Sequence, residues 1–149
     1  MKVEMTAKSL SYADDRGVKS IVVGNGLAVV SIDPKLVRRE SLSSTASVDL
    51  QVGIVDASTL PVRNKLNGGR ILDFSLTVDG KPVTKFDGND FRVAIGYKLK
   101  DGEEPNRVAL YYLNDNGKLE IINYAKYNPK TGNVEFNAKQ LGKYAVKYS

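Results

Sequence analysis

The chain has 149 residues, of which 42% are hydrophobic and 26% are charged, and its formal net charge is +5. These values are ordinary for a globular protein and exclude a disordered chain. The length fits one domain, residues 1–149, that can bury a sizeable core. No apolar run approaches the roughly 18 residues of a membrane span, so we expect no membrane insertion.

Two residue types that often carry chemistry are absent from the chain, because it contains no histidine and no cysteine. Histidine is the most frequent general base near neutral pH and a common metal ligand. Without cysteine, stability must come from the core instead of disulfides. The glycines follow turns and form no phosphate loop or dinucleotide motif. We therefore predict a protein that is not an enzyme and holds no metal and no cofactor.

The basic residues do not suggest a nucleic-acid partner. Lys and Arg number 22 against 17 Asp and Glu, but they are spread along the whole chain. A nucleic-acid-binding protein typically gathers them on one element or interleaves them with aromatic residues. A solvated basic surface is the simpler interpretation.

The segment 33–42, DPKLVRRESL, predicts one short helix. Asp33 can cap the helix, and Pro34 suits its first position. Leu36 and Val37 can then face the core.

Alternation of apolar and polar residues with a period of two predicts half-buried antiparallel strands at 47–54, 71–78 and 91–99. The segment 56–69 is expected to cross between two sheets. The residues expected on the core-facing side are Val48, Leu50, Val52 and Ile54, then Leu72, Phe74, Leu76 and Val78, then Phe91, Val93, Ile95, Tyr97 and Leu99.

Turn sequences separate the strand-like segments, at GNG (24–26), DG (79–80), NDNG (114–117) and KTGN (130–133). Asn-Gly and Asp-Gly favour the positive φ angles of tight hairpins. Eight to ten short strands at this spacing are typical of a sandwich or barrel. The predicted fold is all-β: an antiparallel β-sandwich, immunoglobulin-like in general appearance, with one short helix and a C-terminal meander.

Four of the eight tyrosines fall between residues 109 and 137. Tyr112 is in step with Leu110, which predicts a core position. Tyr111, Tyr124 and Tyr127 remain as candidates for exposed rings that could stack on a sugar. The alternative is that they are ordinary strand residues packed against the protein, since tyrosine is favoured in strands.

Acidic and amide side chains gather in three turns, but their spacing does not predict a calcium loop. Glu120 follows Asn114 too closely for the usual twelve-residue loop. We predict turns, with a calcium ion held between separate loops as the alternative. The residues concerned are Asp14 and Asp15, then Asp87, Asn89 and Asp90, then the segment 114–117.

From residue 70 onward the order of motifs resembles a known family. DFSLTVDGKPVTKF is followed by an alternating strand, then VALYYLNDNGKLEII, then YNPKTGNVEFNAKQLGKYAVKY. This order resembles the β modules that lie beside S-layer homology repeats in clostridial and bacillar surface proteins, including exported glycoside hydrolases. The resemblance covers about half of the chain well and the first seventy residues loosely.

The chain departs from that family at one segment. Relatives often carry His-Phe-Ser before Lys-Tyr-Ala-Val, and similar segments in related eukaryotic modules cleave themselves. Gln140, Leu141 and Gly142 occupy these positions here. A cleavage of that kind requires an attacking hydroxyl and a nearby base. We therefore predict that this chain stays whole.

The resemblance implies a non-enzymatic spacer module, excised from a larger exported protein of a Gram-positive cell surface. Its partners would be neighbouring modules of the same polypeptide. One alternative is a carbohydrate-binding module for plant or cell-wall polysaccharide that uses Tyr111, Tyr124 or Tyr127. Another is a protein-docking module that pairs along an exposed, uncharged sheet edge.

Overall fold

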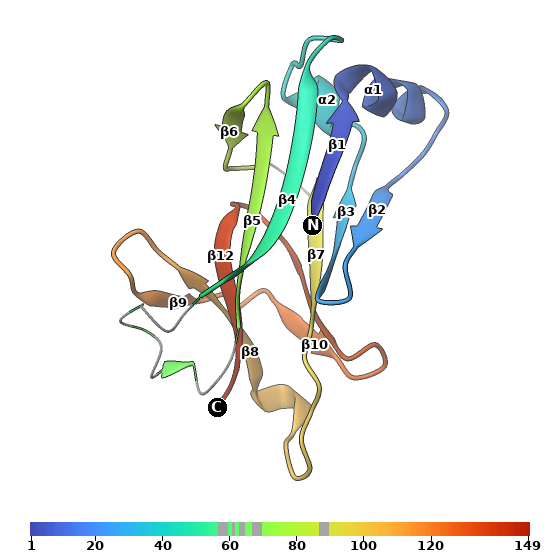
Figure 1. The fold of residues 1–149 in the computed structure, drawn as a ribbon. Helices are drawn as coiled ribbons and strands as arrows, with labels where there is room; N and C mark the ends of the chain where they lie inside the picture. Colours follow the sequence, from blue (N-terminus) through green and yellow to red (C-terminus); the bar gives the residue numbers. More distant parts are fainter. Residues whose placement is uncertain (57–59, 61, 63–64, 67–69, 87–89) are drawn as a thin grey trace.

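The computed structural model describes residues 1–56, 60, 62, 65–66, 70–86 and 90–149. Two antiparallel sheets pack against each other, and two short helices accompany them (Figure 1). The predicted all-β sandwich is confirmed. In the described residues no helix is long and apolar enough to cross a membrane.

The larger sheet has seven strands in the order β1-β4-β5-β12-β8-β9, with β6 paired to β5. All of its pairings are antiparallel. Its strands are β1 (Lys2–Thr6), β4 (Ser47–Val55), β5 (Ile71–Val78), β6 (Lys81–Val83), β8 (Val108–Leu113), β9 (Leu119–Ile121) and β12 (Gly142–Tyr148).

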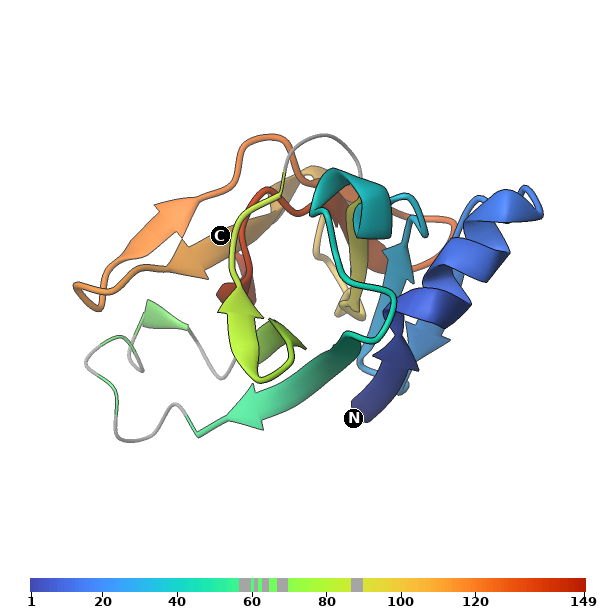
Figure 2. The ribbon, with the colours of Figure 1, turned by 90° about the horizontal axis from the view of Figure 1, so that it is seen from above.

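The smaller sheet has five strands in the order β10-β11-β7-β3-β2 and is also antiparallel. Its strands are β2 (Ile21–Gly24), β3 (Ala28–Ile32), β7 (Phe91–Gly96), β10 (Lys126–Asn128) and β11 (Asn133–Asn137). The helices α1 (Ala7–Asp15) and α2 (Leu36–Arg39) lie together at the upper end of Figure 1, and Figure 2 looks down on that end. A 3₁₀ turn, η3 (Pro105–Arg107), precedes β8.

One apolar core joins the two sheets and both helices. The predicted core-facing residues of β4, β5 and β7 are mostly buried, as the alternation required. Ile54 is an exception, because its side chain is 60% exposed. The pairing of β1 with β4 runs only from Ser47 to Gln51, so Ile54 lies beyond the paired stretch. The predicted strand 91–99 also ends earlier, at Gly96.

The hairpin between β5 and β6 shows the predicted turn chemistry. Asp79 has φ 51° and Gly80 has φ 80°. Positive φ at both central residues is the signature of a type I′ turn, whose twist matches that of the paired strands. The Asp79 carboxylate also accepts the backbone N–H of Ser47 (2.9 Å), which fixes this turn to the start of β4.

The helix α1 was not predicted. Thr6 caps its N-terminus, where Oγ1 accepts the N–H of Ser9 at 3.0 Å. Gly17 follows its last turn with φ 78°, and the N–H of Val18 donates to the Ala13 carbonyl in a Schellman arrangement. Local caps at both ends therefore define a helix that buries only Ala7 and Leu10.

The helix predicted at 33–42 is present but shorter than expected. It begins at Leu36, so Pro34 lies in the preceding turn and not at the first helical position. The Asp33 carboxylate accepts the N–H of Lys35 (2.9 Å) within that turn. Leu36 and Val37 are buried, as predicted.

Two predicted connections are wrong. The segment 56–69 does not cross between sheets, because Val55 and Ile71 at its ends pair with each other in neighbouring strands of one sheet. The C-terminal strands form two hairpins in different sheets instead of one meander. The chain changes sheets between β9 and β10, where Ile122 is buried in the core.

Candidate functional site

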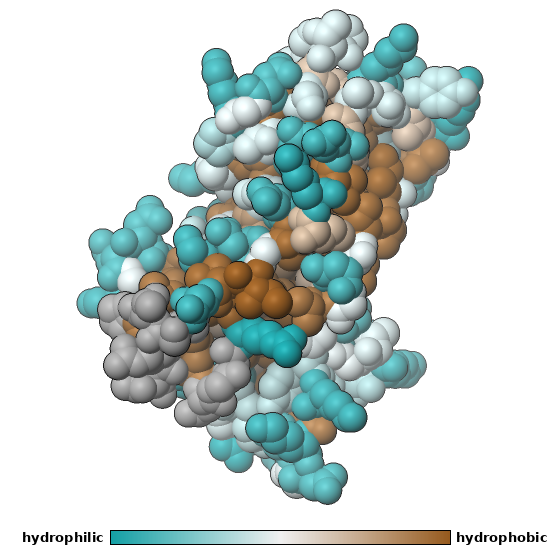
Figure 3. All heavy atoms as spheres, viewed as in Figure 1, coloured by the Kyte–Doolittle hydropathy of each residue, from teal (hydrophilic) through white to brown (hydrophobic). Residues whose placement is uncertain are grey.

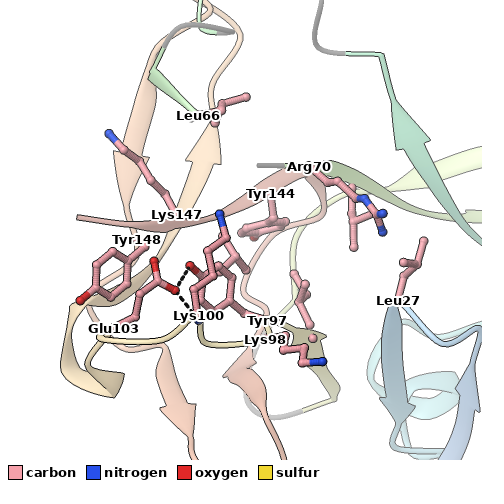
Figure 4. A pocket seen from close by; sticks show the side chains of 14 residues that line it. Leu27, Leu66, Arg70, Tyr97, Lys98, Lys100, Glu103, Tyr144, Lys147 and Tyr148 are labelled. Atoms are coloured by element: carbon pink, nitrogen blue, oxygen red, sulfur yellow. Dashed lines mark hydrogen bonds between the residues drawn. The ribbon is translucent and has the colours of Figure 1, made fainter. Parts of the chain in front are cut away.

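A cleft of about 480 Å³ opens between the two sheets. The larger sheet contributes residues near the start of β5 and along β12, and the smaller sheet contributes the end of β7 and the β2–β3 turn (Figure 4). Its volume falls within the range of small-molecule sites, roughly 300–1,000 Å³. Aliphatic side chains form much of its wall: Leu27, Leu66, Leu72, Ile95 and Val146.

Three tyrosines line the cleft, and each hydroxyl already has a protein partner. Tyr97 donates to Glu103 Oε1 (2.8 Å). Tyr144 donates to the Gln140 carbonyl (2.6 Å). Tyr148 accepts the N–H of Glu104 (2.9 Å). The hydroxyls therefore hold the protein's own backbone and carboxylate.

The Tyr97–Glu103 contact fixes the ionisation of both groups. Burial, together with the hydrogen bond to Glu103 and its negative charge, raises the pKa of Tyr97 to about 12. The N–H of Lys100 donates to the same Glu103 oxygen (2.9 Å), and this bond lowers the pKa of Glu103, with the Tyr97 hydroxyl adding to the effect. At neutral pH the pair is a neutral phenol donating to a carboxylate, which is a binding geometry and not an activated nucleophile.

Cationic side chains surround the mouth of the cleft. Arg70, Lys98 and Lys100 all line the cleft; in Figure 4 the Arg70 guanidinium extends toward the side of Leu27, the Lys98 side chain lies below it, and Lys100 lies beside Tyr97. Among the described residues, none of these three forms an ion pair. Lys147 also lines the cleft, but its ammonium lies 5.9 Å from the ring of Tyr111, away from the opening.

Tyr111, one of the three predicted sugar-binding residues, is half-buried on β8. It pairs with Ala145 and Ile121 on the neighbouring strands. The ammonium of Lys147 lies over its ring.

Tyr127 packs toward the core from β10. Its ring meets that of Tyr97 edge-on, with centroids 6.4 Å apart. Its hydroxyl donates to the Tyr97 carbonyl (3.0 Å). Tyr127 therefore helps to hold the end of β7 that borders the cleft.

Of the three predicted tyrosines, Tyr124 is the exposed one, at 38%, whereas Tyr111 and Tyr127 are half-buried. It lies in the turn between β9 and β10, and the Lys139 ammonium is 4.8 Å from its ring centroid. Within the described residues, no ring contact joins Tyr111, Tyr124 and Tyr127 to one another. They do not form one continuous ring surface there.

Tyr124 borders a separate hollow of about 370 Å³ on the smaller sheet. Arg92 and Glu135 face each other there at 3.7 Å, and Arg92 also donates to Asn137 (3.4 Å). A ring beside charged and amide groups provides both a stacking face and hydrogen-bonding partners. The hollow is lined by Arg92, Tyr124, Lys126, Glu135, Phe136, Asn137 and Lys139.

The acidic turns are engaged in ion pairs and turn hydrogen bonds. Arg38 of α2 pairs with Asp14 and Asp15, and Arg39 pairs with the buried Asp90. The Asn114 side chain accepts the N–H groups of two residues in its own turn. Asp87 and Asn89 lie outside the described residues. In the part of the chain that the structure describes, no three acidic side chains come together as a metal site would require.

The sequence interpretation missed the cleft itself. It placed Tyr97 on a core face and gave no role to Arg70 or Lys100. The available signal was the tyrosines at strand ends beside lysines, as in the segments 97–100 and 147–148. Comparison with known families, curated proteins and solved structures found no match to this chain.

Proposed function

We propose that the chain is a non-enzymatic structural module of an exported Gram-positive surface protein, which holds neighbouring modules apart. The observation that carries this proposal is the large apolar core that joins both sheets and both helices. Such a core stabilises the fold without disulfides or metal, which suits a module that must fold outside the cell. The resemblance of residues 70–149 to modules beside S-layer homology repeats supports the setting.

The distribution of the predicted tyrosines also favours a structural role. Tyr127 is bonded to the backbone of β7, and Tyr111 lies beneath Lys147 on its own sheet. A sugar-binding platform requires several exposed rings aligned on one surface, because stacking energy comes from uncovered ring faces. The described contacts instead use these two rings within the fold.

The proposal is tested by calorimetric titration of the protein with soluble xylan, cellulose fragments and peptidoglycan fragments. We expect no saturable heat with any of them. A micromolar affinity that disappears in Tyr124→Ala or Tyr127→Ala, and persists in Tyr12→Ala, would overturn the structural role. Tyr12 is a matched control because it is 57% exposed on α1 and lines none of the hollows described above.

The second candidate function is carbohydrate binding at the hollow beside Tyr124. The exposed ring lies next to the linked side chains of Arg92, Glu135 and Asn137. Guanidinium, carboxylate and amide groups can hydrogen-bond sugar hydroxyls while the ring stacks on the sugar face. In this case Tyr124→Ala and Asn137→Ala would both weaken binding, whereas Tyr111→Ala would leave it unchanged.

A further inference from the structure

We propose that the cleft between the sheets binds a small amphiphilic anion, which has an apolar body and a carboxylate or phosphate head group. This inference goes beyond the structural role and does not depend on it. The apolar body would lie between the sheets, and the head group would remain at the mouth among Arg70, Lys98 and Lys100.

The wall of the cleft determines the apolar part of the ligand. Leu72 and Ile95 come from opposite sheets, and Leu27 approaches from the β2–β3 turn. Figure 3 shows hydrophobic residues at the surface across the middle of one face. Leu72 and Ile95 are only 3% and 5% exposed, so a ligand reaches them by entering the cleft. Covering this surface with an apolar group is favourable by about 25 cal/mol for each Å² removed from water.

The mouth determines the charge of the ligand. Three cationic side chains border it, and none has an ion-pair partner among the described residues. The one carboxylate in the lining, Glu103, accepts hydrogen bonds from Tyr97 and from the backbone of Lys100 and interacts with the charge of Lys100, so it offsets only one of the positive charges. Low-dielectric walls strengthen the attraction of the remaining positive charge for an anion.

A sugar fits this cleft poorly. Its many hydroxyls would need partners, but the Tyr97 and Tyr144 hydroxyls already donate within the protein. The aliphatic side chains offer none, and an unpaired hydroxyl in such a wall costs roughly 1–3 kcal/mol. The cleft therefore differs in ligand chemistry from the hollow beside Tyr124.

The test is calorimetric titration of the intact protein with decanoate and decyl phosphate below their micelle concentrations. We expect saturable one-to-one binding of both. Acetate and inorganic phosphate, which carry the head group alone, should give no saturable signal. Decyltrimethylammonium has the same apolar chain with the opposite charge and should bind at least about tenfold more weakly.

Charge variants identify the site. Lys100→Glu and Arg70→Glu should each weaken decanoate binding by about three- to tenfold or more, because each replaces an attractive charge by a repulsive one. Lys130→Glu is the matched control, since Lys130 is exposed in the β10–β11 turn and outside the cleft lining. All three changes are on exposed side chains, so thermal melting should confirm that each variant is folded.

Equal affinity for the anionic and cationic amphiphiles, or absence of saturable binding, would overturn the proposal. So would an equal loss of affinity in Lys130→Glu and Lys100→Glu. Sedimentation with phosphatidylglycerol vesicles separates two sources of the ligand. If the protein co-sediments with the vesicles and Lys100→Glu reduces this, the anion is a lipid. If the protein binds decanoate or decyl phosphate but does not co-sediment, the anion is a diffusible molecule.

Discussion

Gly142 faces the ring of Tyr112 at the start of β12. A Cβ atom on Gly142 would stand 3.1 Å from Tyr112 Oη and 3.3 Å from Cε2. The φ angle of Gly142 is 135°, which L-residues rarely adopt. Two independent features therefore favour glycine at this position.

Gly142→Ser should lower the free energy of unfolding by about 1–3 kcal/mol, the usual cost of a side chain in a rarely populated backbone conformation. The matched control is Gly53→Ala, because a Cβ there meets nothing within 4 Å and no positive φ is required. Urea unfolding, monitored by circular dichroism, measures the free energy of unfolding of both variants. Equal stability of Gly142→Ser and the original protein would show that the backbone relaxes readily at this point.

The chain should not cleave itself after Leu141. No hydroxyl is present at residue 142 to receive the acyl group in an N-to-O shift. The backbone on either side is also held, because the Leu141 N–H donates to the Thr84 carbonyl (2.8 Å) and Gln140 accepts the Tyr144 hydroxyl. Intact mass after several days at 37 °C should equal the sequence mass. A fragment ending at residue 141 would contradict this prediction.

The ion pair between Arg39 and Asp90 should contribute measurably to stability. The Asp90 side chain is only 1% exposed, whereas that of Arg39 is 46% exposed. Breaking a fully buried pair costs about 3–5 kcal/mol, and solvent around Arg39 reduces the expected loss in Arg39→Ala to about 1–3 kcal/mol. Arg92→Ala, which breaks the surface pair with Glu135, should cost less than about 1 kcal/mol. Equal losses would show that burial of Asp90 does not matter.

Stability should fall between about pH 10 and pH 12 through Tyr97. Its pKa is raised to about 12 in the fold from an ordinary value of 10.0, so the fold favours the neutral phenol. The stabilisation is complete below pH 10 and is lost as the pH rises through the folded pKa. Tyr97→Phe should therefore lose melting temperature less steeply over this interval than the original protein.

Glu103→Gln provides a second test of the same pair. It removes the negative charge while keeping an acceptor, so the pKa of Tyr97 should move down toward its ordinary value. The ultraviolet absorbance of tyrosinate during an alkaline titration follows this change. An unaltered titration in Glu103→Gln would attribute the raised pKa to burial alone.

The sequence predicted the sandwich because alternate residues of β4, β5 and β7 bury one face in a shared core. That signal depends on burial, and it failed at Ile54, because β4 extends there beyond its pairing with β1. The helix α1 gave no such signal, since only Ala7 and Leu10 of its nine residues are buried. Its caps, Thr6 and Gly17, were readable but carry little weight without an apolar stripe.

The candidate cleft could not be predicted from local patterns. Arg70 and Lys100 are thirty positions apart in the chain, and only the packing of the two sheets brings them to one cleft. Likewise, the spacing of Tyr111 and Tyr127 does not show that they belong to different sheets. They lie in different sheets because the chain changes sheets between β9 and β10.

The proposed structural role implies a larger surface protein around this chain, and it is tested most directly in that protein, by exchanging residues 1–149 for an unrelated cysteine-free β-sandwich of similar length. The measurement is the amount of parent protein retained on the cell wall, together with the activity of its neighbouring modules. A spacer acts through its fold and length, so both should remain unchanged. Loss of wall retention or of neighbouring activity, with the exchanged protein still folded and exported, would show that this module makes specific contacts and would contradict the proposed role.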